Sequence, residues 1–537
     1  MPNIPVRGVG EIGVVTDINP QDAPTSSWSD ARNVRFAEGS LSRYSVFRKV
    51  SSSYTYAKTP VGIFNGWSNG EGYLTTVFTD GSFEELHNNT AVETKPASSG
   101  YSSDQITVST LGGLTYVNRS NDVPYYRERP GGTGFMPIPF WSEFDRCYSL
   151  RAFKDYLIAL NVSKSGIDYP GMVKWSDAVQ MGAPPQSWST LGGSSLAGEN
   201  VLNDVEGRLI DGLPLGDCFM IYGEHQAYRM DYIGAPFIFS FTKMFSDQGV
   251  IARNCIVDVE NKHYVFGRSD IFVTDGITRQ SIVSERIQKQ IYSEIDFEQV
   301  QRCFCYHDRI HGEIAFCYPS NADDSPWMLK DLEGCNRAAV FNYKFNTWTF
   351  VDIPSLVGST EASLVSTASW EDFGTWDEAT PNWSSFAGQR PRGLMLCSTG
   401  NPALAAPAQS YILDDLVKGR WPYELDANVL WPAYAEALNR DLDELGAEII
   451  GRKLVTRIVP QYRVGDGLSS LVLKVGGAAT PDGSVTWGMP KTFVGYLDTK
   501  YDTRINGRYL SMRIEIPAIS YAEVSGYDIT MQAIAGR

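Results

Sequence analysis

The sequence has no long apolar run and no excess of positive charge. No apolar stretch approaches the roughly 20 residues that span a bilayer, so we expect no membrane span. Acidic residues number 62 against 46 basic ones, a formal charge of −16. An acidic chain gains little from the release of counterions from nucleic acid, so it is a poor candidate for binding nucleic acid through the phosphate backbone. The first residues, MPNIPVRGVGEIGVV, lack the apolar core of a secretory signal, which predicts synthesis in the cytoplasm.

Disulfide frameworks and catalytic motifs are also missing. The eight cysteines show no framework spacing and should be mostly reduced in the cytoplasm. The sequence contains no GxSxG elbow, Walker A loop or HExxH. The Asp-box repeat of sialidases, SxDxGxTW, is absent as well, which weakens a sugar-cleaving function. We therefore predict no enzyme and no cofactor. A glycosidase remains an alternative, because the separation of two carboxylates is a three-dimensional property.

What the chain has in abundance is strand and turn formers. Glycine (49) and tyrosine (28) are frequent, and short β-rich runs are divided by tight turns, with Asp80-Gly81 and Asp275-Gly276 as strong turn signals. A chain of 537 residues should form two to four domains. Hairpins at irregular spacing predict a sandwich or a degenerate β-propeller, and no repeat is regular enough to give a blade count.

The chain divides into four predicted regions. We expect a mainly β protein with an extended N-terminal arm or platform (1–55), a propeller-like region (56–400), a partly helical insertion (401–446) and a C-terminal β-sandwich (447–537). The arm should contain a hairpin that turns at Glu38-Gly39.

Two segments have helical periodicity. One is VSERIQKQIYSEI, in which Ile287, Ile291 and Ile295 form one stripe and Ser284 is the predicted cap. The other is AYAEALNRDLDELG (433–446), whose Leu438, Leu442 and Leu445 are in phase and which ends at a glycine.

Three motifs were tested for chemistry. Gly8-Val-Gly10-Glu-Ile-Gly13 matches the dinucleotide fingerprint GxGxxG. That motif needs a preceding buried strand and a following helix, and we expect neither here, so we interpret the glycines as a turn.

A second motif contains residue types that bind zinc, namely Cys303, Cys305, His307 and His311. Their spacing is incomplete, and buried cysteines beside a surface histidine are the favoured interpretation.

The third motif is SWEDFGTWDEATPNWSSF, residues 369–386. Trp370, Trp376 and Trp383 recur beside acidic and hydroxyl side chains, an arrangement that could stack on sugars or anchor a partner protein. Packing of the three rings onto a neighbouring sheet is the favoured alternative.

Four stretches together resemble the hub or nozzle (tail tubular) proteins of short-tailed bacteriophages. They are residues 17–43, residues 172–188, the hairpins of 216–234 and 245–276, and the C-terminal pieces 493–515 and 524–530. The resemblance covers most of the chain and is poorest over 401–446. It implies a β-propeller with platform-like domains and no catalytic residue.

The resemblance also implies a place in the virion. Six copies would form a ring in the tail, docked on a portal adaptor protein and facing the tail needle, spike or fibre proteins. DNA would pass through during ejection without specific binding. The acidic balance suits such a conduit, because a wall that repels phosphate does not hold the genome. The alternatives are a host-receptor or carbohydrate-binding propeller with the tryptophan segment as its platform, a glycan-cleaving enzyme, and a cellular propeller scaffold.

Overall fold

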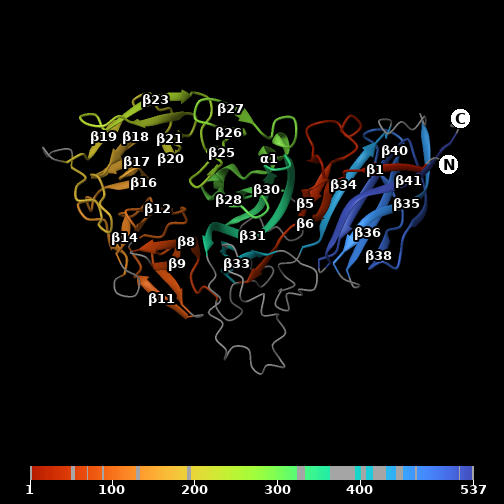
Figure 1. Cartoon of the computed structure of the whole chain (residues 1–537), viewed down its shortest axis with the longest axis horizontal. Coiled ribbons are helices and arrows are strands. Elements are labelled where there is room, and N and C mark those ends of the chain that lie inside the picture. Colours follow the sequence, from red (N-terminus) through yellow and green to blue (C-terminus); the bar gives the residue numbers. More distant parts are fainter. Residues whose placement is uncertain are drawn as a thin grey trace, which may run out of the picture.

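The computed structural model is built almost entirely of β-strands, as the composition predicts. It describes residues 3–49, 55–68, 71–87, 90–98, 100–128, 134–189, 195–322, 333–362, 393–400, 407–414, 431–442, 451–465, 469–518 and 520–534. Figure 1 shows two bodies along the longest axis, a ring of small sheets at one end and two packed sheets at the other. Both chain termini lie at the end formed by the packed sheets.

Five four-stranded antiparallel sheets follow one another along the chain, and each is a propeller blade. Blade 1 is β8 (Pro60–Ser68), β9 (Glu71–Phe78), β10 (Phe83–His87) and β11 (Thr90–Lys95). Blade 2 is β12 (Thr107–Leu111), β13 (Leu114–Asn118), β14 (Tyr125–Arg127) and β15 (Met136–Pro137). Blade 3 is β16 (Arg146–Phe153), β17 (Tyr156–Lys164), β18 (Ile167–Trp175) and β19 (Gly198–Val201). Blade 4 is β20 (Leu209–Leu215), β21 (Cys218–Gly223), β22 (Ala227–Tyr232) and β23 (Phe239–Phe245). Blade 5 is β24 (Ile256–Val259), β25 (Lys262–Phe266), β26 (Ile271–Thr274) and β27 (Arg279–Ser281).

Blades 6 and 7 share one long strand, β31 (Thr347–Ala362). Its first part pairs with β30 (Cys335–Asn342), which continues through β29 (Glu313–Tyr318) to β28 (Phe304–Asp308). Its second part pairs with β32 (Gly393–Ser398), which is followed by β33 (Gln409–Asp414). The outermost strand of blade 7 comes from the N-terminal segment, because β7 (Val46–Lys49) pairs with β33. Strand β31 also packs against β8 of blade 1, so the ring of seven blades closes.

The second body is a β-sandwich that draws strands from both ends of the chain. One sheet contains β39 (Tyr501–Gly507), β35 (Arg452–Val464), β41 (Ala522–Ile534), β6 (Ser40–Arg43), β5 (Val34–Ala37) and β1 (Asn3–Arg7). The other contains β4 (Asp30–Arg32), β34 (Ala433–Arg440), β40 (Tyr509–Ile516), β36 (Ser470–Ala478), β37 (Thr486–Trp487) and β38 (Lys491–Val494). Apolar side chains of the two sheets, among them Ile458, Leu473 and Ile514, belong to one buried cluster.

The N-terminal segment joins the two bodies. Strand β4 pairs with β34 of the sandwich and, at Arg32, with Phe350 of β31. Short strands β2 (Gly13–Val14) and β3 (Ser27–Trp28) lie beside the same part of β31. A single hydrogen-bonded sheet therefore runs from blades 6 and 7 into the sandwich. The hairpin predicted at Glu38-Gly39 is confirmed, with both residues at positive φ.

One of the two predicted helices forms. Helix α1 (Gln288–Glu294) forms, and Ile287, Ile291 and Ile295 are all buried, which confirms the stripe. Ser284 is not its cap: Ile287 occupies that position and makes no side-chain capping bond. A short 3₁₀ segment, η1 (Phe297–Arg302), follows. Within the described residues, neither α1 nor η1 has the length and apolar composition needed to cross a bilayer.

The helix predicted over 433–446 is wrong for its first eight residues. These form strand β34, in which Ala433, Ala435 and Ala437 alternate inward. Pairing with β40 and β4 on its two sides outweighs the helix propensity of alanine. All regular structure in the described residues of 401–446 is strand.

Candidate functional site

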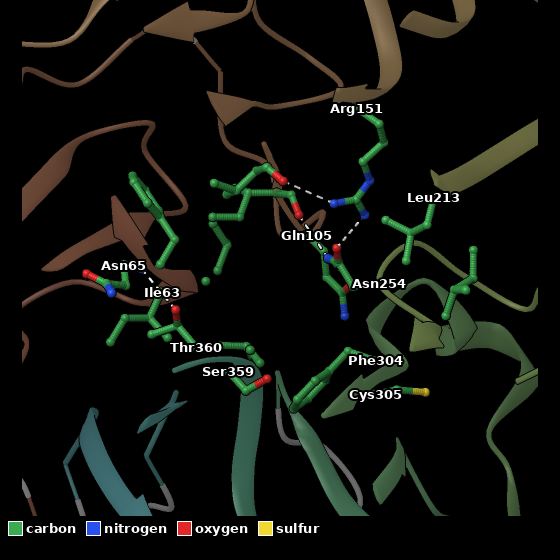
Figure 2. A pocket seen from close by; sticks show the side chains of 18 residues that line it. Ile63, Asn65, Gln105, Arg151, Leu213, Asn254, Phe304, Cys305, Ser359 and Thr360 are labelled. Carbon is green, nitrogen blue, oxygen red and sulfur yellow. Dashed lines mark hydrogen bonds between the residues drawn. The ribbon is translucent and has the colours of Figure 1, made fainter. Parts of the chain in front are cut away.

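A cavity lies where the inner strands of the propeller meet. Its volume is about 290 Å³, and it is lined from all seven blades. Each blade contributes from its innermost strand or from the residues directly before that strand, and Figure 2 shows these side chains around the opening. In a propeller the blades are arranged radially, so their innermost strands surround the central axis. The side chains of these strands set the width of the channel along that axis.

The strongest polar contact at the cavity joins blades 3 and 4. Arg151 of β16 holds Asp211 of β20 through two bonds, Nε to Oδ1 at 2.8 Å and Nη2 to Oδ2 at 2.5 Å. Ser149 Oγ also donates to Asp211, and so does the backbone N–H of Asn254. Burial alone would raise the pKa of the Asp211 carboxyl, but the charge of Arg151 and these hydrogen bonds outweigh it and lower the pKa.

Asn254 and Gln105 extend this network to blades 2, 5 and 6. The Asn254 side chain accepts from Arg151 Nη2 at 2.8 Å and donates to Gln105 Oε1 at 3.1 Å and to the Ile106 carbonyl at 2.9 Å. Gln105 Nε2 donates to the carbonyls of Arg302 and Cys303. Figure 2 shows Arg151, Asn254 and Gln105 converging on one wall of the cavity.

Gln105, Asn254 and Arg151 have little hydrogen-bonding capacity left for a ligand. Both amide hydrogens of Gln105 and of Asn254 are donated within the protein. Arg151 likewise donates from Nε, Nη1 and Nη2 to protein oxygens. A binding site usually presents unpaired polar groups to its ligand. The arrangement instead ties neighbouring blades to one another around the axis.

The cysteines and histidines that resemble zinc ligands have separate partners. Cys303 and Cys305 are buried, and the Cys305 thiol points away from the cavity in Figure 2. Burial raises the pKa of both thiols, which keeps them protonated and poor metal ligands. His307 Nε2 contacts Tyr343 Oη at 3.1 Å, and His311 Nδ1 contacts Asp308 Oδ2 at 2.6 Å.

His311 does belong to a different group of metal-ligand types. Atoms of Asp308, His311 and Glu313, at the turn between β28 and β29, lie within 4.8 Å of one another. Arg35 of β5 contacts both Glu313 oxygens, at 2.7 and 3.1 Å. A guanidinium already balances the carboxylate charge here, so the group fastens the N-terminal segment to blade 6.

The three glycines of the GxGxxG match serve close chain packing. A Cβ on Gly10 would lie 1.9 Å from the Ser40 carbonyl oxygen, and one on Gly13 would lie 2.7 Å from that of Trp348. Gly8 has a φ of +65°, which glycine adopts at little cost. Contrary to the sequence expectation, strand β1 directly precedes the motif, but residues 9–12 form a turn and strand β2 follows in place of a helix, so the turn interpretation of the glycines holds.

Trp370, Trp376 and Trp383 lie outside the described residues.

Four residues of the cavity network were not identified from the sequence, namely Arg151, Asp211, Asn254 and Gln105. They come from four different blades and have no local spacing that marks them. The available signal was a buried charge in a strand: Arg151 and Asp211 each lie within an otherwise apolar run, and buried charges are usually paired.

Comparisons with known proteins add little. No family model and no curated protein matches the sequence. Among solved structures, the chain is similar to the WD40 β-propeller domain of Doa1, with 9% identity, a TM-score of 0.37, and coverage of 71% of this chain and 100% of that one. A similarity at this level does not carry the fold assignment. The seven-bladed propeller follows from the order and pairing of the strands.

Proposed function

We propose that the chain is a structural subunit of a short-tailed phage tail, a hub or nozzle protein that docks on the portal adaptor and forms part of the DNA ejection channel. The observation that carries the proposal is the construction of the N-terminal segment. Residues 3–49 contribute strands to the sandwich and to blade 7, so the propeller and the platform are one continuous body. A component that transmits load between neighbours benefits from such a connection.

The interior chemistry is consistent with a non-catalytic role. The polar side chains at the cavity bond to one another across blades. Burial raises the pKa of Cys255, Cys303 and Cys335, which disfavours the thiolate that nucleophilic chemistry needs. We place function in the outer surfaces of the two bodies, as expected for a six-membered ring with heterologous interfaces.

Quantitative mass spectrometry of purified virions tests the proposal. We expect about six copies of this chain for each twelve-subunit portal ring, because a closed ring fixes the stoichiometry. Absence from virions would refute the proposal and favour a cellular scaffold. A much higher copy number would place the chain on the capsid surface.

The receptor-binding and glycan-cleaving alternatives have tests of their own. Glycan-array binding that Trp376→Ala abolishes would support a carbohydrate-binding propeller. Hydrolysis of host surface polysaccharide by the purified protein, lost on changing one carboxylate, would support an enzyme.

A further inference from the structure

The sandwich carries three highly exposed apolar side chains that are close together in the sequence. Met489, Tyr496 and Leu497, beside strand β38, are 88%, 68% and 86% exposed. We call these three residues the apolar apex. Single exposed apolar residues are ordinary, but three within nine positions, all exposed by more than half, are candidates for an interaction surface.

The apex is held rigidly by the sandwich below it. The Tyr496 ring stacks on Tyr462 of β35 with centroids 6.4 Å apart, and its hydroxyl donates to the Val464 carbonyl. Tyr462 Oη donates to the Gly495 carbonyl at 3.0 Å. The Met489 carbonyl accepts from the Tyr501 hydroxyl, and Lys491 pairs with Asp498 at 3.0 Å. These contacts hold the backbone on both sides of β38 and the Tyr496 ring in place, which reduces the backbone entropy lost on binding.

The segment that contains the apex has a net charge opposite to that of the whole chain. Residues 451–516 contain ten basic and five acidic side chains, whereas the whole chain has a charge of −16. Several of the basic side chains are exposed on β35, on β39 and between β38 and β39; they are Arg452, Arg457, Arg463, Lys500 and Arg504. Asp502 neutralises part of this charge by pairing with Arg457 at 2.6 Å and Lys500 at 3.0 Å.

We propose that the apolar apex and the exposed basic side chains of residues 451–516 dock on an anionic lipid surface. Exposed aliphatic side chains can enter the boundary between headgroups and acyl chains. The tyrosine ring suits the interface, because its polar end is already bonded to protein. Lysine and arginine beside them attract anionic headgroups. An acidic chain is repelled by such a surface unless its basic region approaches first, so the charge distribution also fixes the orientation.

Two other partners fit the surface less well. Duplex DNA would use the basic side chains but has no apolar layer to receive Met489 and Leu497. A second copy of the chain would need a recess for the three side chains, and at its central cavity Gln105, Arg151 and Asn254 are already bonded to one another and to Asp211. The inference does not depend on the proposed function.

Flotation of the full chain with vesicles tests the proposal. We expect binding to vesicles of phosphatidylcholine that contain about 30% phosphatidylglycerol, and little binding to vesicles of phosphatidylcholine alone. The double variant Met489→Ser, Leu497→Ser should lose about tenfold in apparent affinity. Lys500→Glu with Arg504→Glu should lose at least as much, because each basic residue near an anionic surface contributes about a fivefold change.

A matched control separates the apex from exposed apolar residues in general. Met181 and Phe237 of the propeller are 85% and 75% exposed and lie outside the basic region. Met181→Ser with Phe237→Ser should leave vesicle binding unchanged, and circular dichroism should show that all variants fold.

Three results would overturn the proposal. They are equal binding to both vesicle types or to neither, an apex variant that binds like the native chain, and self-association in vesicle-free solution that the apex variant abolishes. The last result would assign the surface to a second copy of the chain, and binding of a short DNA duplex in place of vesicles would assign it to nucleic acid.

Discussion

Asp211 is the most heavily bonded carboxylate at the propeller axis. Its two oxygens accept from Arg151, Ser149 and the backbone N–H of Asn254, and its side chain is 1% exposed. A charge in such a place is stabilising only as part of its pair, since removing one partner leaves the other buried and uncompensated.

Asp211→Asn should therefore destabilise the chain by about 3 kcal/mol, because Arg151 would keep its charge without a counter-charge. Chemical denaturation at pH 7 measures the loss. Asp217→Asn is the control, since the Asp217 side chain is fully exposed at 105% and its loss should change little. An Asp211→Asn protein as stable as the native one would show that the pair contributes nothing net.

The same pair predicts an acid limit. The pKa of Asp211 is lower in the folded protein than its ordinary value, so the unfolded state binds the proton more readily. The contribution is complete above the unfolded pKa of about 4 and is lost as the pH falls through the folded pKa. The stability difference between the native chain and Asp211→Asn should shrink below pH ~4.

His263 should give a second pH dependence in a higher range. It is buried in blade 5, with Nδ1 at 3.0 Å from the Tyr222 hydroxyl and Nε2 at 3.0 Å from the Pro214 carbonyl. Burial lowers its pKa, and the hydrogen bond to Pro214 opposes this only in part. Native His263 stays neutral where an unfolded histidine, with a pKa of about 6.5, takes up a proton, so stability should fall as the pH drops below about 6.5.

Denaturation curves between pH 8 and pH 5 (roughly the range of histidine titration) measure this effect. His263→Gln should remove part of the slope, although it lowers stability at all pH values. His225→Gln, at an exposed turn, is the control for replacing a histidine outside the core. An unchanged slope in His263→Gln would mean that His263 is protonated in the folded state.

At the scale of elements, local patterns predicted hairpins well and long-range pairing poorly. The turns at Asp80-Gly81 and Asp275-Gly276 form as expected: Asp80 Oδ1 accepts from Ser82 N–H and Asp275 Oδ1 from Thr278 N–H, and both glycines have positive φ. Strand β34 was missed because its Leu438 is in helical phase with Leu442 and Leu445, which follow the strand. Its strand character depends on β4, which lies about 400 residues away in the chain, and no local pattern contains that information.

Strand β7 is the element whose loss should matter most to the ring. Phe47 is buried against the rings of Tyr411 and Trp431, with centroids 6.5 and 6.4 Å away. Phe47→Ala should cost about 3–5 kcal/mol and should speed amide hydrogen exchange in β33 and β32 more than in blade 4. Phe345→Ala, at a position that is 40% exposed, is the control with little effect. Uniform exchange across all blades would contradict a local opening at blade 7.

At the scale of the whole molecule, the sequence predicted a propeller joined to a sandwich but not how they are connected. The seven blades are hidden in the sequence because blades 6 and 7 share β31 and because blade 7 takes its last strand from residue 46 onward. The N-terminal arm was recognised as extended, yet its role as a shared component depends on partners such as Glu313 and Asp528 that are distant in the sequence. The cavity network was missed for the same reason.

Arg35→Met tests the connection between the two bodies. Glu313 would remain buried without its guanidinium partner, so stability should fall by about 3 kcal/mol, with faster hydrogen exchange in both the β5–β6 hairpin and β29. Arg309→Met removes a partner of Glu361 at a side chain that is 69% exposed and should cost no more than about 1 kcal/mol. A change confined to the hairpin would show that the two bodies are not coupled there.

The pairing of β7 with β33 also sets the order of events on the ribosome. Lys49 is opposite Tyr411, so the partner strand is translated about 360 residues after β7, a delay of roughly 20 to 70 s at about 5–20 residues per second. Blades 1 to 5 are sequence-local and can form as they emerge, while β1 and β7 must wait for β41 and β33. An unpaired strand edge invites misassembly during that interval. The nascent chain should therefore be a substrate for chaperones until the ring closes, and a translational slowdown before β33 would lengthen its exposure.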